Sequence, residues 1–440
     1  MFPKVLILNQ PFDNKTGGGI TLSNLFDRWP KDNLKVACPS QLILPYTNFE
    51  MCKEYYQLGH LEQKWIFPFN YLRAKSKSGS KFKTKIDFEQ IPDSKTFSTF
   101  SLKKTLIEKL FLPFIHYSGV INFIYKIDVS KNFFKWVNNF NPDLIYAQAQ
   151  SLQEVVFCRK LHEATGIPMV FHMMDDWVTL SSQSKISQAL WKRKVKFEFE
   201  KLLQQCDSLL TISEYMAKEY HKRYGIKSQA FHNPVDIKFW GNEEMLKIYV
   251  DDSPIILYAG RVGLGIDDSL ISLANAVESL NSDFDSKIKF HIQSERPPSW
   301  ITKFDCVIHK SFGPYKDLPK IFSQADLLYL PYDFSDDSIQ FIKYSMPTKA
   351  SEYMISGTPI FILAPKDTAI VEYAQRENWA VTLTSNKIED IKLKLKEILY
   401  NNTLRETVSI QARRICLSNH EKNVVQEKFY KELMNSCKTH

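Results

Sequence analysis

The sequence predicts an α/β protein of two domains, each built on a doubly wound parallel sheet. Three observations lead to this prediction. The 440 residues exceed what a single hydrophobic core usually serves. Apolar, strand-like runs alternate with helical patterns in both halves of the chain, and a polar, turn-prone segment at residues 232–236 separates the halves. We therefore predict one domain over residues 1–232 and a second over residues 233–419.

The first half opens with an apolar run at residues 4–9, then a glycine-rich turn and a helical pattern, which is how a doubly wound sheet begins. Residues 40–140 have mixed patterns, which indicate insertions and helices. Ser213 is expected to cap one helix, and Gly225 to stop it. The other strands and helices of this half are expected at residues 34–38, 144–147, 152–165, 169–172, 185–205, 207–212 and 214–224.

The second half repeats the alternation of strands and helical patterns and ends in a helix at residues 421–434. Ligands of open parallel sheets bind at the carboxyl ends of the strands, so two such sheets that face each other would place a site between them. The strands are expected at residues 255–259, 288–292, 305–308, 327–330, 360–363 and 380–383.

The composition indicates a folded protein of a reducing compartment. With 44% hydrophobic and 13% aromatic residues, the chain is poorly suited to disorder. Its seven cysteines are scattered, odd in number and never spaced Cys-x-x-Cys, which argues against structural disulfides and zinc sites. The apolar N-terminal run lacks the cleavage site of a signal peptide, and no window is long enough to span a bilayer. We therefore expect a cytoplasmic protein.

The net charge of +8 is concentrated in two places. One is a basic stretch at residues 73–85. Both clusters are explained equally well by a solvated surface and by attraction to an anionic partner. The candidate partners are a lipid head group, a pyrophosphate and, least favoured, a nucleic acid. The aromatic segment at residues 111–125 is either a buried helix or an interfacial element, so segments 73–85 and 111–125 are the predicted peripheral contacts with the inner face of a membrane. The second basic place comprises Lys192, Arg193, Lys194 and Lys196.

Gly17, Gly18 and Gly19 follow the first strand and precede a helix. A bare backbone permits positive φ and lets amide N–H groups and a helix N-terminus approach a phosphate. A plain tight turn explains the three glycines about equally well. Their spacing is neither the dinucleotide fingerprint nor a P-loop.

A polar cluster stands at the end of the strand at residues 169–172. His172 ends this strand, and Asp175 and Asp176 follow shortly after it. At a carboxyl end of the sheet, the histidine can bond a substrate hydroxyl, and either aspartate can accept a bond from an acceptor hydroxyl or act as a base. The alternative is a satisfied core histidine beside aspartates that cap the next segment.

Two segments of the second half indicate an anionic ligand. Arg261 follows the strand at residues 255–259, where a fixed guanidinium can contact a diphosphate through two nitrogens; a surface arginine in a turn is the weaker alternative. Further on, Thr348 is expected to cap a helix, which places Lys349 at an N-terminus that favours phosphate. Glu352 lies about one turn along and can accept two hydrogen bonds from a vicinal diol such as ribose, or else serve as a capping-box glutamate.

Taken in order, these segments resemble the retaining nucleotide-sugar glycosyltransferases of family 4 over nearly the whole chain. The resemblance implies the GT-B fold, with two Rossmann-like domains facing each other across a cleft, an acceptor domain first and a donor domain second. It implies a nucleotide diphosphate-sugar as donor, metal-independent transfer without a cofactor, and a C-terminal helix at residues 420–440 that packs back on the first domain. The segments that carry it are the triple glycine and residues 206–214, 232–236, 258–261 and 347–359.

By the same likeness, the glycines lie near the donor phosphates, Arg261 and Lys349 neutralise them, Glu352 holds the ribose, and His172 is a plausible match to the family's sugar-contacting histidine. The predicted catalytic residues are His172, Asp175, Arg261 and Lys349. The predicted donor-binding residues are Gly18, Gly19, Arg261, Thr348, Lys349 and Glu352, and no metal ligands are predicted.

The chain departs from the family pattern at two positions. Tyr344 stands where the first of the family's paired glutamates is expected, and Ile266 stands where a lysine usually follows the arginine. The usual sugar anchor and one phosphate cation are therefore absent, although Asp336 or Asp337 is a candidate replacement for the missing acid.

The predicted function is sugar transfer from a nucleotide diphosphate-sugar to a glycan, a lipid-linked acceptor or a protein, in the synthesis of cell-surface polysaccharide or glycoprotein. The departures at Tyr344 and Ile266 motivate an alternative, a non-catalytic partner of an active glycosyltransferase. A nucleotide-sugar epimerase with the same two-domain fold is a further, weaker alternative.

Overall fold

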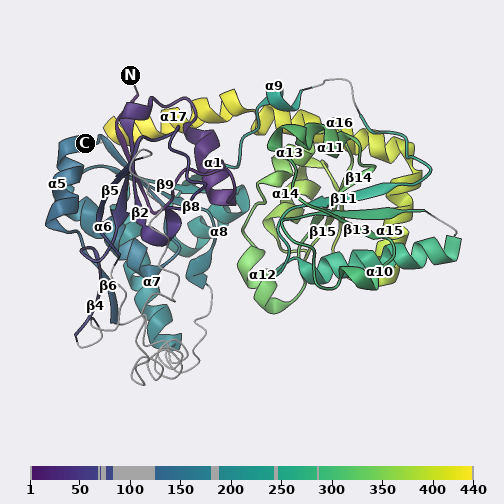
Figure 1. Ribbon diagram of the computed structural model, residues 1–440, viewed down its shortest axis with the longest axis horizontal. Coiled ribbons are helices and arrows are strands. Elements are labelled where there is room, and N and C mark those ends of the chain that lie inside the picture. The colour runs from purple at the N-terminus through teal and green to yellow at the C-terminus, as the bar shows by residue number, and fades with distance from the viewer. Residues whose placement is uncertain are drawn as a thin grey trace. The chain divides into compact units, whose positions relative to one another are not determined.

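The computed structural model describes residues 2–67, 70, 76–82, 124–179, 188–241, 246–284 and 287–438. The chain divides into two units, each with its own sheet (Figure 1). Unit 1 consists of Met1–Thr211, Glu219–Gln229 and Phe429–His440, and unit 2 of Ile212–Lys218 and Ala230–Lys428. The chain thus passes between the units close to the predicted boundary at residue 232 and again within its last helix.

Unit 1 contains an eight-stranded sheet with the order β10-β9-β8-β7-β1-β2-β3-β5. The pairings from β9 through β8, β7, β1 and β2 to β3 are parallel, and β5 joins β3 antiparallel. Every residue of β1, β7 and β8 is buried, as expected for parallel strands covered on both faces. The strands are β1 (Val5–Leu8), β2 (Leu34–Pro39), β3 (Glu54–Leu58), β5 (Gly79–Phe82), β7 (Leu144–Ala147), β8 (Met169–Met173), β9 (Ser208–Thr211) and β10 (Ser228–Ala230).

The expectation of insertions and helices at residues 40–140 is partly wrong. Besides one helix, the described residues of this stretch form β3, β5 and the antiparallel pair of β4 (Gln63–Trp65) and β6 (Tyr125–Ile127). In β3 both Tyr55 and Tyr56 are buried, so the alternation that usually reveals a strand is missing. Residues 111–123, 73–75 and 83–85 of the two predicted membrane contacts lie outside the described residues.

The helices of this part of the chain begin and end close to their predicted bounds. The cap predicted at Ser213 is confirmed, because its Oγ accepts a hydrogen bond of 3.1 Å from the Met216 amide, and Gly225 ends the helix with φ of +72°. The helices are α1 (Gly17–Phe26), α5 (Lys131–Phe140), α6 (Leu152–Thr165), α7 (Gln188–Gln205) and α8 (Glu214–Tyr224).

Unit 2 contains a six-stranded sheet with the order β13-β12-β11-β14-β15-β16, and all five of its pairings are parallel. The order reverses at β11, the first strand of the unit, which makes the sheet doubly wound as predicted. The strands are β11 (Ile255–Ala259), β12 (Lys289–Gln293), β13 (Val307–Lys310), β14 (Leu327–Pro331), β15 (Ile360–Leu363) and β16 (Val381–Leu383).

Helices cover this second sheet, with α10 along one face and α11 and α13 on the other (Figure 1). Among the described residues, none of the helices of the chain combines the length and the apolar character needed to cross a membrane. The helices are α9 (Ile237–Trp240), α10 (Asp267–Phe284), α11 (Leu318–Ser323), α12 (Asp336–Ile342), α13 (Lys349–Ile355), α14 (Ala369–Glu377), α15 (Ile388–Tyr400) and α16 (Asn402–Asn419).

The last helix, α17 (Lys422–Lys438), starts in unit 2 and ends in unit 1. Within unit 1 its Phe429 is fully buried, with ring centroids 5.1 Å from Phe26 and 5.9 Å from Tyr146. Leu433 is also fully buried, whereas Val424, near the start of the helix, is 37% exposed. Val424 therefore lies outside the buried face of α17.

Candidate functional site

The carboxyl end of β11 and the start of α13 bring Arg261 and Lys349 into one region of unit 2. Arg261 lies in the loop directly after β11, where its Nη1 donates to the Leu264 carbonyl at 3.0 Å. Tyr258 Oη donates to the Arg261 carbonyl and holds this loop against the strand. Lys349 is the first residue of α13, and its Nζ lies 4.0 Å from the centroid of the Tyr258 ring. Tyr258 thus links the two cations.

The Lys349 ammonium is buried without a directly bonded carboxylate among the described residues. Its Nζ makes no hydrogen bond or ion pair within the part of the chain that the structure describes, apart from the cation–π contact with Tyr258. Burial, assisted by repulsion from Arg261, lowers the pKa of Lys349 to about 7, although Glu352 opposes the shift. An anionic group bound here would gain a charge partner and restore the charged form of the lysine.

Gly260 leaves the space that the Lys349 ammonium occupies. A Cβ at this position would lie 2.1 Å from Lys349 Nζ and 3.0 Å from Tyr258 Oη. The nearer atom is the end of a flexible side chain, so an alanine would displace the ammonium rather than the fold. Sequence reasoning quoted Gly260 within a motif but gave it no role.

We therefore expect Gly260→Ala to fold normally and to weaken the binding of an anion such as pyrophosphate at Lys349 by about tenfold, because the displaced ammonium loses a charge-assisted contact. Isothermal titration calorimetry with pyrophosphate measures the change. Gly313→Ala is the matched control, since nothing lies within 4 Å of a Cβ added there. Equal affinities for the Gly260 variant and the wild type would contradict the assigned role of this glycine.

Glu352 is 8% exposed and lies one turn along α13. Tyr315 Oη donates to Glu352 Oε1 at 3.1 Å, and burial raises the pKa of the carboxyl to about 7. The Tyr315 ring in turn stacks on Phe239, with centroids 5.0 Å apart and an interplanar angle of 12°. Tyr315 therefore orients a carboxyl that would otherwise lack a hydrogen bond, a contact between distant segments that no local pattern indicates.

The predicted cap at Thr348 is wrong. Its side chain makes no capping hydrogen bond, and its backbone is already helical, with φ of −54° and ψ of −35°. A capping box needs that bond, so the capping-box alternative for Glu352 fails as well. The start of α13 is instead held by Asn233, whose Nδ2 donates to the Thr348 carbonyl at 3.2 Å and whose carbonyl accepts from Ser351 Oγ at 2.8 Å. The segment at residues 232–236 thus supports the helix that carries Lys349.

The two departures from the family pattern are core positions in unit 2. Tyr344 is 7% exposed and stacks on Tyr215, with centroids 5.6 Å apart. Ile266 is 6% exposed and belongs to the hydrophobic core. The candidate replacements Asp336 and Asp337 are exposed in the first turn of α12, where their charge favours the helix N-terminus.

The three glycines of unit 1 form the first turn of α1 rather than a loop with positive φ, so that expectation is wrong. The Gly19 amide donates to Thr16 Oγ1 at 3.1 Å, which is an N-cap bond. A Cβ at Gly19 would lie 2.0 Å from Asp13 Oδ2, and one at Gly18 would lie 2.9 Å from Gln10 Oε1. These glycines are required by close packing against Asp13 and Gln10, and Asp13 also accepts bonds from the Thr16 amide and hydroxyl.

His172 is 1% exposed at the end of β8, and a hydrogen-bonded chain reaches it from β7. Gln148 Nε2 donates to Tyr146 Oη at 3.2 Å, and Tyr146 Oη lies 2.6 Å from His172 Nδ1. This chain is satisfied when the tyrosine donates to Nδ1, which places the imidazole proton on Nε2. Burial lowers the pKa of His172 to about 3, so the ring is a neutral donor.

The two aspartates after β8 have different environments. Asp176 is 3% exposed, accepts from Tyr220 Oη at 2.8 Å and pairs with Arg223 Nη1 at 2.8 Å. Thr179 Oγ1 also donates to it at 2.9 Å, so both carboxylate oxygens are engaged within unit 1, which favours a structural role for Asp176. Asp175 is partly exposed and remains a predicted catalytic residue.

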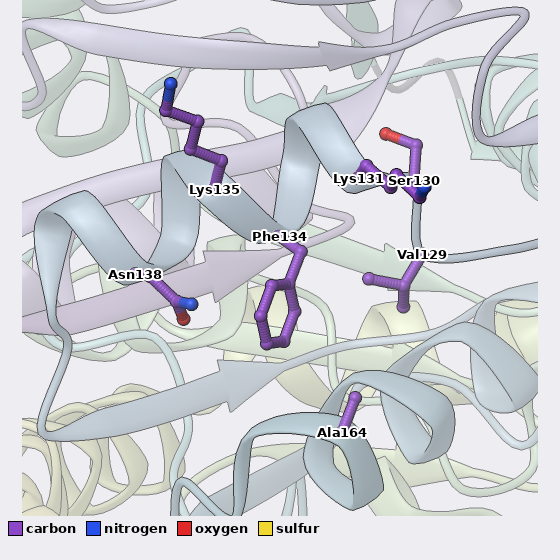
Figure 2. A pocket seen from close by; sticks show the side chains of 7 residues that line it. All are labelled: Val129, Ser130, Lys131, Phe134, Lys135, Asn138 and Ala164. Atoms are coloured by element: carbon purple, nitrogen blue, oxygen red, sulfur yellow. The ribbon is translucent and has the colours of Figure 1, made fainter.

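A hollow of about 400 Å³ opens between α5 and α6 of unit 1. Figure 2 shows Phe134 projecting from α5 toward Ala164 of α6, with the Asn138 amide on the same side of α5 and the Lys135 ammonium pointing away. None of the predicted site residues is among its described lining residues, and none of these lining residues is a carboxylate, a histidine or a cysteine.

Comparison with known proteins places these sites in context. Residues 110–239 match the model of Glycosyltransferase Family 4. Curated protein sequences give no match. Among solved structures, sucrose-phosphate synthase from Thermosynechococcus elongatus matches with a TM-score of 0.61 at 12% identity, over 98% of this chain and 99% of that one. HepE from Anabaena, in complex with UDP and glucose, matches with a TM-score of 0.59 at 12% identity, over 98% of this chain and 99% of that one. A glycosyltransferase from Rickettsia africae matches with a TM-score of 0.59 at 10% identity, over all of both chains.

The chain has the GT-B fold. The parallel sheets of its two units are those of this fold, and the match over residues 110–239 supports a family 4 glycosyltransferase of the GT-B type. At 10–12% identity these structures define the GT-B fold alone, and the roles of individual residues must be argued from the chain itself.

Proposed function

We propose that this GT-B protein transfers a sugar from a nucleoside diphosphate-sugar to an acceptor hydroxyl, with the donor bound in unit 2. The observation that carries the proposal is the Lys349 ammonium, which makes no hydrogen bond or ion pair with a carboxylate among the described residues and lies one turn from the buried carboxyl of Glu352. A diphosphate satisfies the first group and the ribose diol of the same nucleotide satisfies the second. HepE from Anabaena, which shares the fold, was solved with UDP and with UDP-glucose, which favours UDP as the first nucleotide to test.

In the proposed reaction the bond between the anomeric carbon and the diphosphate oxygen breaks, and the acceptor oxygen forms the new bond to that carbon. Arg261 and Lys349 stabilise the negative charge that grows on the departing diphosphate, worth about 3–4 kcal/mol per well-placed donor in other enzymes. If the configuration is retained, the leaving phosphate takes the acceptor proton, so no protein nucleophile and no metal ion is required. In unit 1 we propose that His172 bonds a hydroxyl of the sugar and that Asp175 accepts a bond from the acceptor hydroxyl. Gly18 and Gly19, at the N-terminus of α1, are proposed to contact the donor phosphates.

The acceptor we propose is a lipid-linked glycan at the inner face of a membrane, in cell-surface polysaccharide or glycoprotein synthesis. It rests on the excess of basic residues in the sequence. The buried Tyr344 favours one alternative, a non-catalytic partner that binds nucleotide without turnover. Such a protein would respond to nucleoside diphosphates but hydrolyse or transfer no sugar from any donor.

The test is thermal unfolding with UDP, GDP, ADP, CMP and dTDP, each with and without magnesium. A ligand at a hundred times its dissociation constant adds about 2.7 kcal/mol of stability. If one nucleotide alone raises the unfolding temperature, with or without magnesium, the result supports the proposal and identifies the base. The 2′-deoxy form of that nucleotide should then stabilise the protein less, because Glu352 loses half of the diol that it is proposed to bind. No stabilisation by any of the five would overturn the donor site.

Nucleoside diphosphate affinity is expected to fall as the pH rises above about 7. The depressed pKa of Lys349 means that the ammonium is present below about pH 7 and is lost as the pH rises through that value, so binding above it takes up one proton. The affinity should fall by up to tenfold per pH unit. Calorimetry in buffers of different ionisation enthalpy counts the proton.

Glu352→Gln removes the second group that titrates near pH 7, so a pH dependence that persists in this variant belongs to Lys349. Affinity in the Glu352→Gln variant that stays constant between about pH 6 and pH 9 would contradict the assignment.

A further inference from the structure

The outer face of α7 combines exposed apolar side chains with a cluster of cations. Leu190 is 66% exposed and Phe197 is 54% exposed. They lie seven residues apart, so they share one face of the helix. The opposite face is the buried one, since Val195, Phe199, Leu202 and Leu203 are all at most 3% exposed. Packing of the helix therefore explains its inner face but not Leu190 and Phe197.

Cations surround the two apolar residues. Lys201 Nζ lies 4.3 Å from the centroid of the Phe197 ring, and four further exposed cations stand between Leu190 and Phe197 in the sequence. Long basic side chains next to exposed apolar ones can lay their stems on an apolar surface while their charges reach anionic groups. The four cations are Lys192, Arg193, Lys194 and Lys196.

The acidic residues of α7 do not cancel this charge. Glu198 turns to the neighbouring helix, where Arg159 of α6 contacts its Oε2 at 3.1 Å. Glu200 forms a long ion pair of 3.8 Å with Lys196. The helix therefore carries five cations against two carboxylates, one of which is neutralised by α6.

We propose that this face of α7, called here the α7 face and defined by Leu190, Arg193, Lys194, Phe197 and Lys201, docks the protein on a bilayer of anionic phospholipid. Apolar side chains enter the boundary between head groups and acyl chains, and the cations contact lipid phosphates. Nucleic acid would use the cations but would leave Leu190 without a partner. The proposal stands apart from the donor site, because the α7 face belongs to unit 1 and contains none of the donor-binding residues.

The same chain offers a matched control in α15. Leu393 is 67% exposed and Tyr400 is 66% exposed, seven residues apart on a helix that also carries lysines. There, however, Lys392 pairs with Asp283 at 2.8 Å and Lys394 pairs with Glu397 at 2.6 Å. The α15 surface therefore has the apolar residues of the α7 face, but two of its lysines already have carboxylate partners.

The experiment is flotation of the full chain with vesicles of phosphatidylcholine alone or mixed with phosphatidylglycerol, at low and at high salt. We expect flotation with the anionic vesicles, weakened by salt. Leu190→Ser with Phe197→Ser should weaken it by roughly tenfold. Arg193→Gln with Lys201→Gln should weaken it by about fivefold for each cation removed. Leu393→Ser with Tyr400→Ser should leave it unchanged, and hydrogen exchange should slow in α7 on vesicle binding.

Several results would overturn the proposal: no flotation of the wild type at low salt, undiminished flotation of the Leu190 and Phe197 double variant, or equal losses in the α15 control. Binding to a short RNA that depends on the cations but not on Leu190 and Phe197, without flotation, would assign the face to nucleic acid instead. Stabilisation by UDP is measured on every variant, so a loss of flotation with intact nucleotide binding separates the α7 face from the donor site.

Discussion

Replacing Lys349 with methionine is expected to lower kcat/KM for the nucleotide-sugar by about a hundredfold or more while the protein stays folded. The ammonium is buried at the start of α13 and makes no hydrogen bond or ion pair with a carboxylate among the described residues, so its expected use is to meet the charge of the diphosphate. Methionine keeps the aliphatic length of the side chain and its packing on Tyr258. Since burying the ammonium is unfavourable without a ligand, the variant should be as stable as the wild type or more stable.

The measurement is steady-state release of UDP, once the nucleotide panel has identified a donor, together with the thermal unfolding of the free protein. Lys366→Met is the control, because Lys366 is an exposed lysine of the same unit. A larger loss in kcat than in affinity for UDP would show that Lys349 acts mainly as the diphosphate leaves. An unchanged kcat/KM would remove Lys349 from the mechanism, whatever the outcome for Arg261.

The sequence predicted the strands and helices near the donor site well because their signals are local. The apolar run at residues 255–259 ends where β11 ends, and Lys349 stands at the start of a helix as expected. The environments of these side chains are not local. Tyr315 reaches Glu352 from 37 residues away, and Tyr258 meets Lys349 across the fold. Such contacts arise only when strands distant in sequence pair in the sheet, so no single segment encodes them.

The glycines of α1 and the aspartates after β8 show a different limit of sequence reasoning. A run of glycines predicts backbone freedom, but here Gly19 is needed because Asp13 Oδ2 occupies the position of a side chain. Asp175 and Asp176 look alike in the sequence, yet Asp176 is the one bonded to Tyr220 and Arg223 of α8 at 2.8 Å each. In both cases the partner, rather than the residue itself, decides the role.

Replacing Asp176 with alanine is expected to destabilise unit 1 by about 3 kcal/mol. The carboxylate is buried and is bonded to Tyr220, Arg223 and Thr179, so its loss leaves a buried phenol hydroxyl and part of a guanidinium without their acceptor. Arg223 keeps a second contact, 2.6 Å from Nε to Glu219, which limits the cost. Amide hydrogen exchange in β8 and α8, measured by mass spectrometry as a function of urea, reports the change in the elements that Asp176 joins.

Asp128→Ala is the matched control for this loss of stability. Asp128 also pairs with a cation of the same unit, Lys160, but both side chains are about 40% exposed. Exposed pairs contribute about 1 kcal/mol or less, so the control should change little. If the two variants were destabilised equally, the ion pair of Asp176 would be no stronger than a surface pair. That result would contradict the structural role of Asp176. A large difference, with nucleotide binding intact in both variants, would leave Asp175 as the carboxylate to test for catalysis.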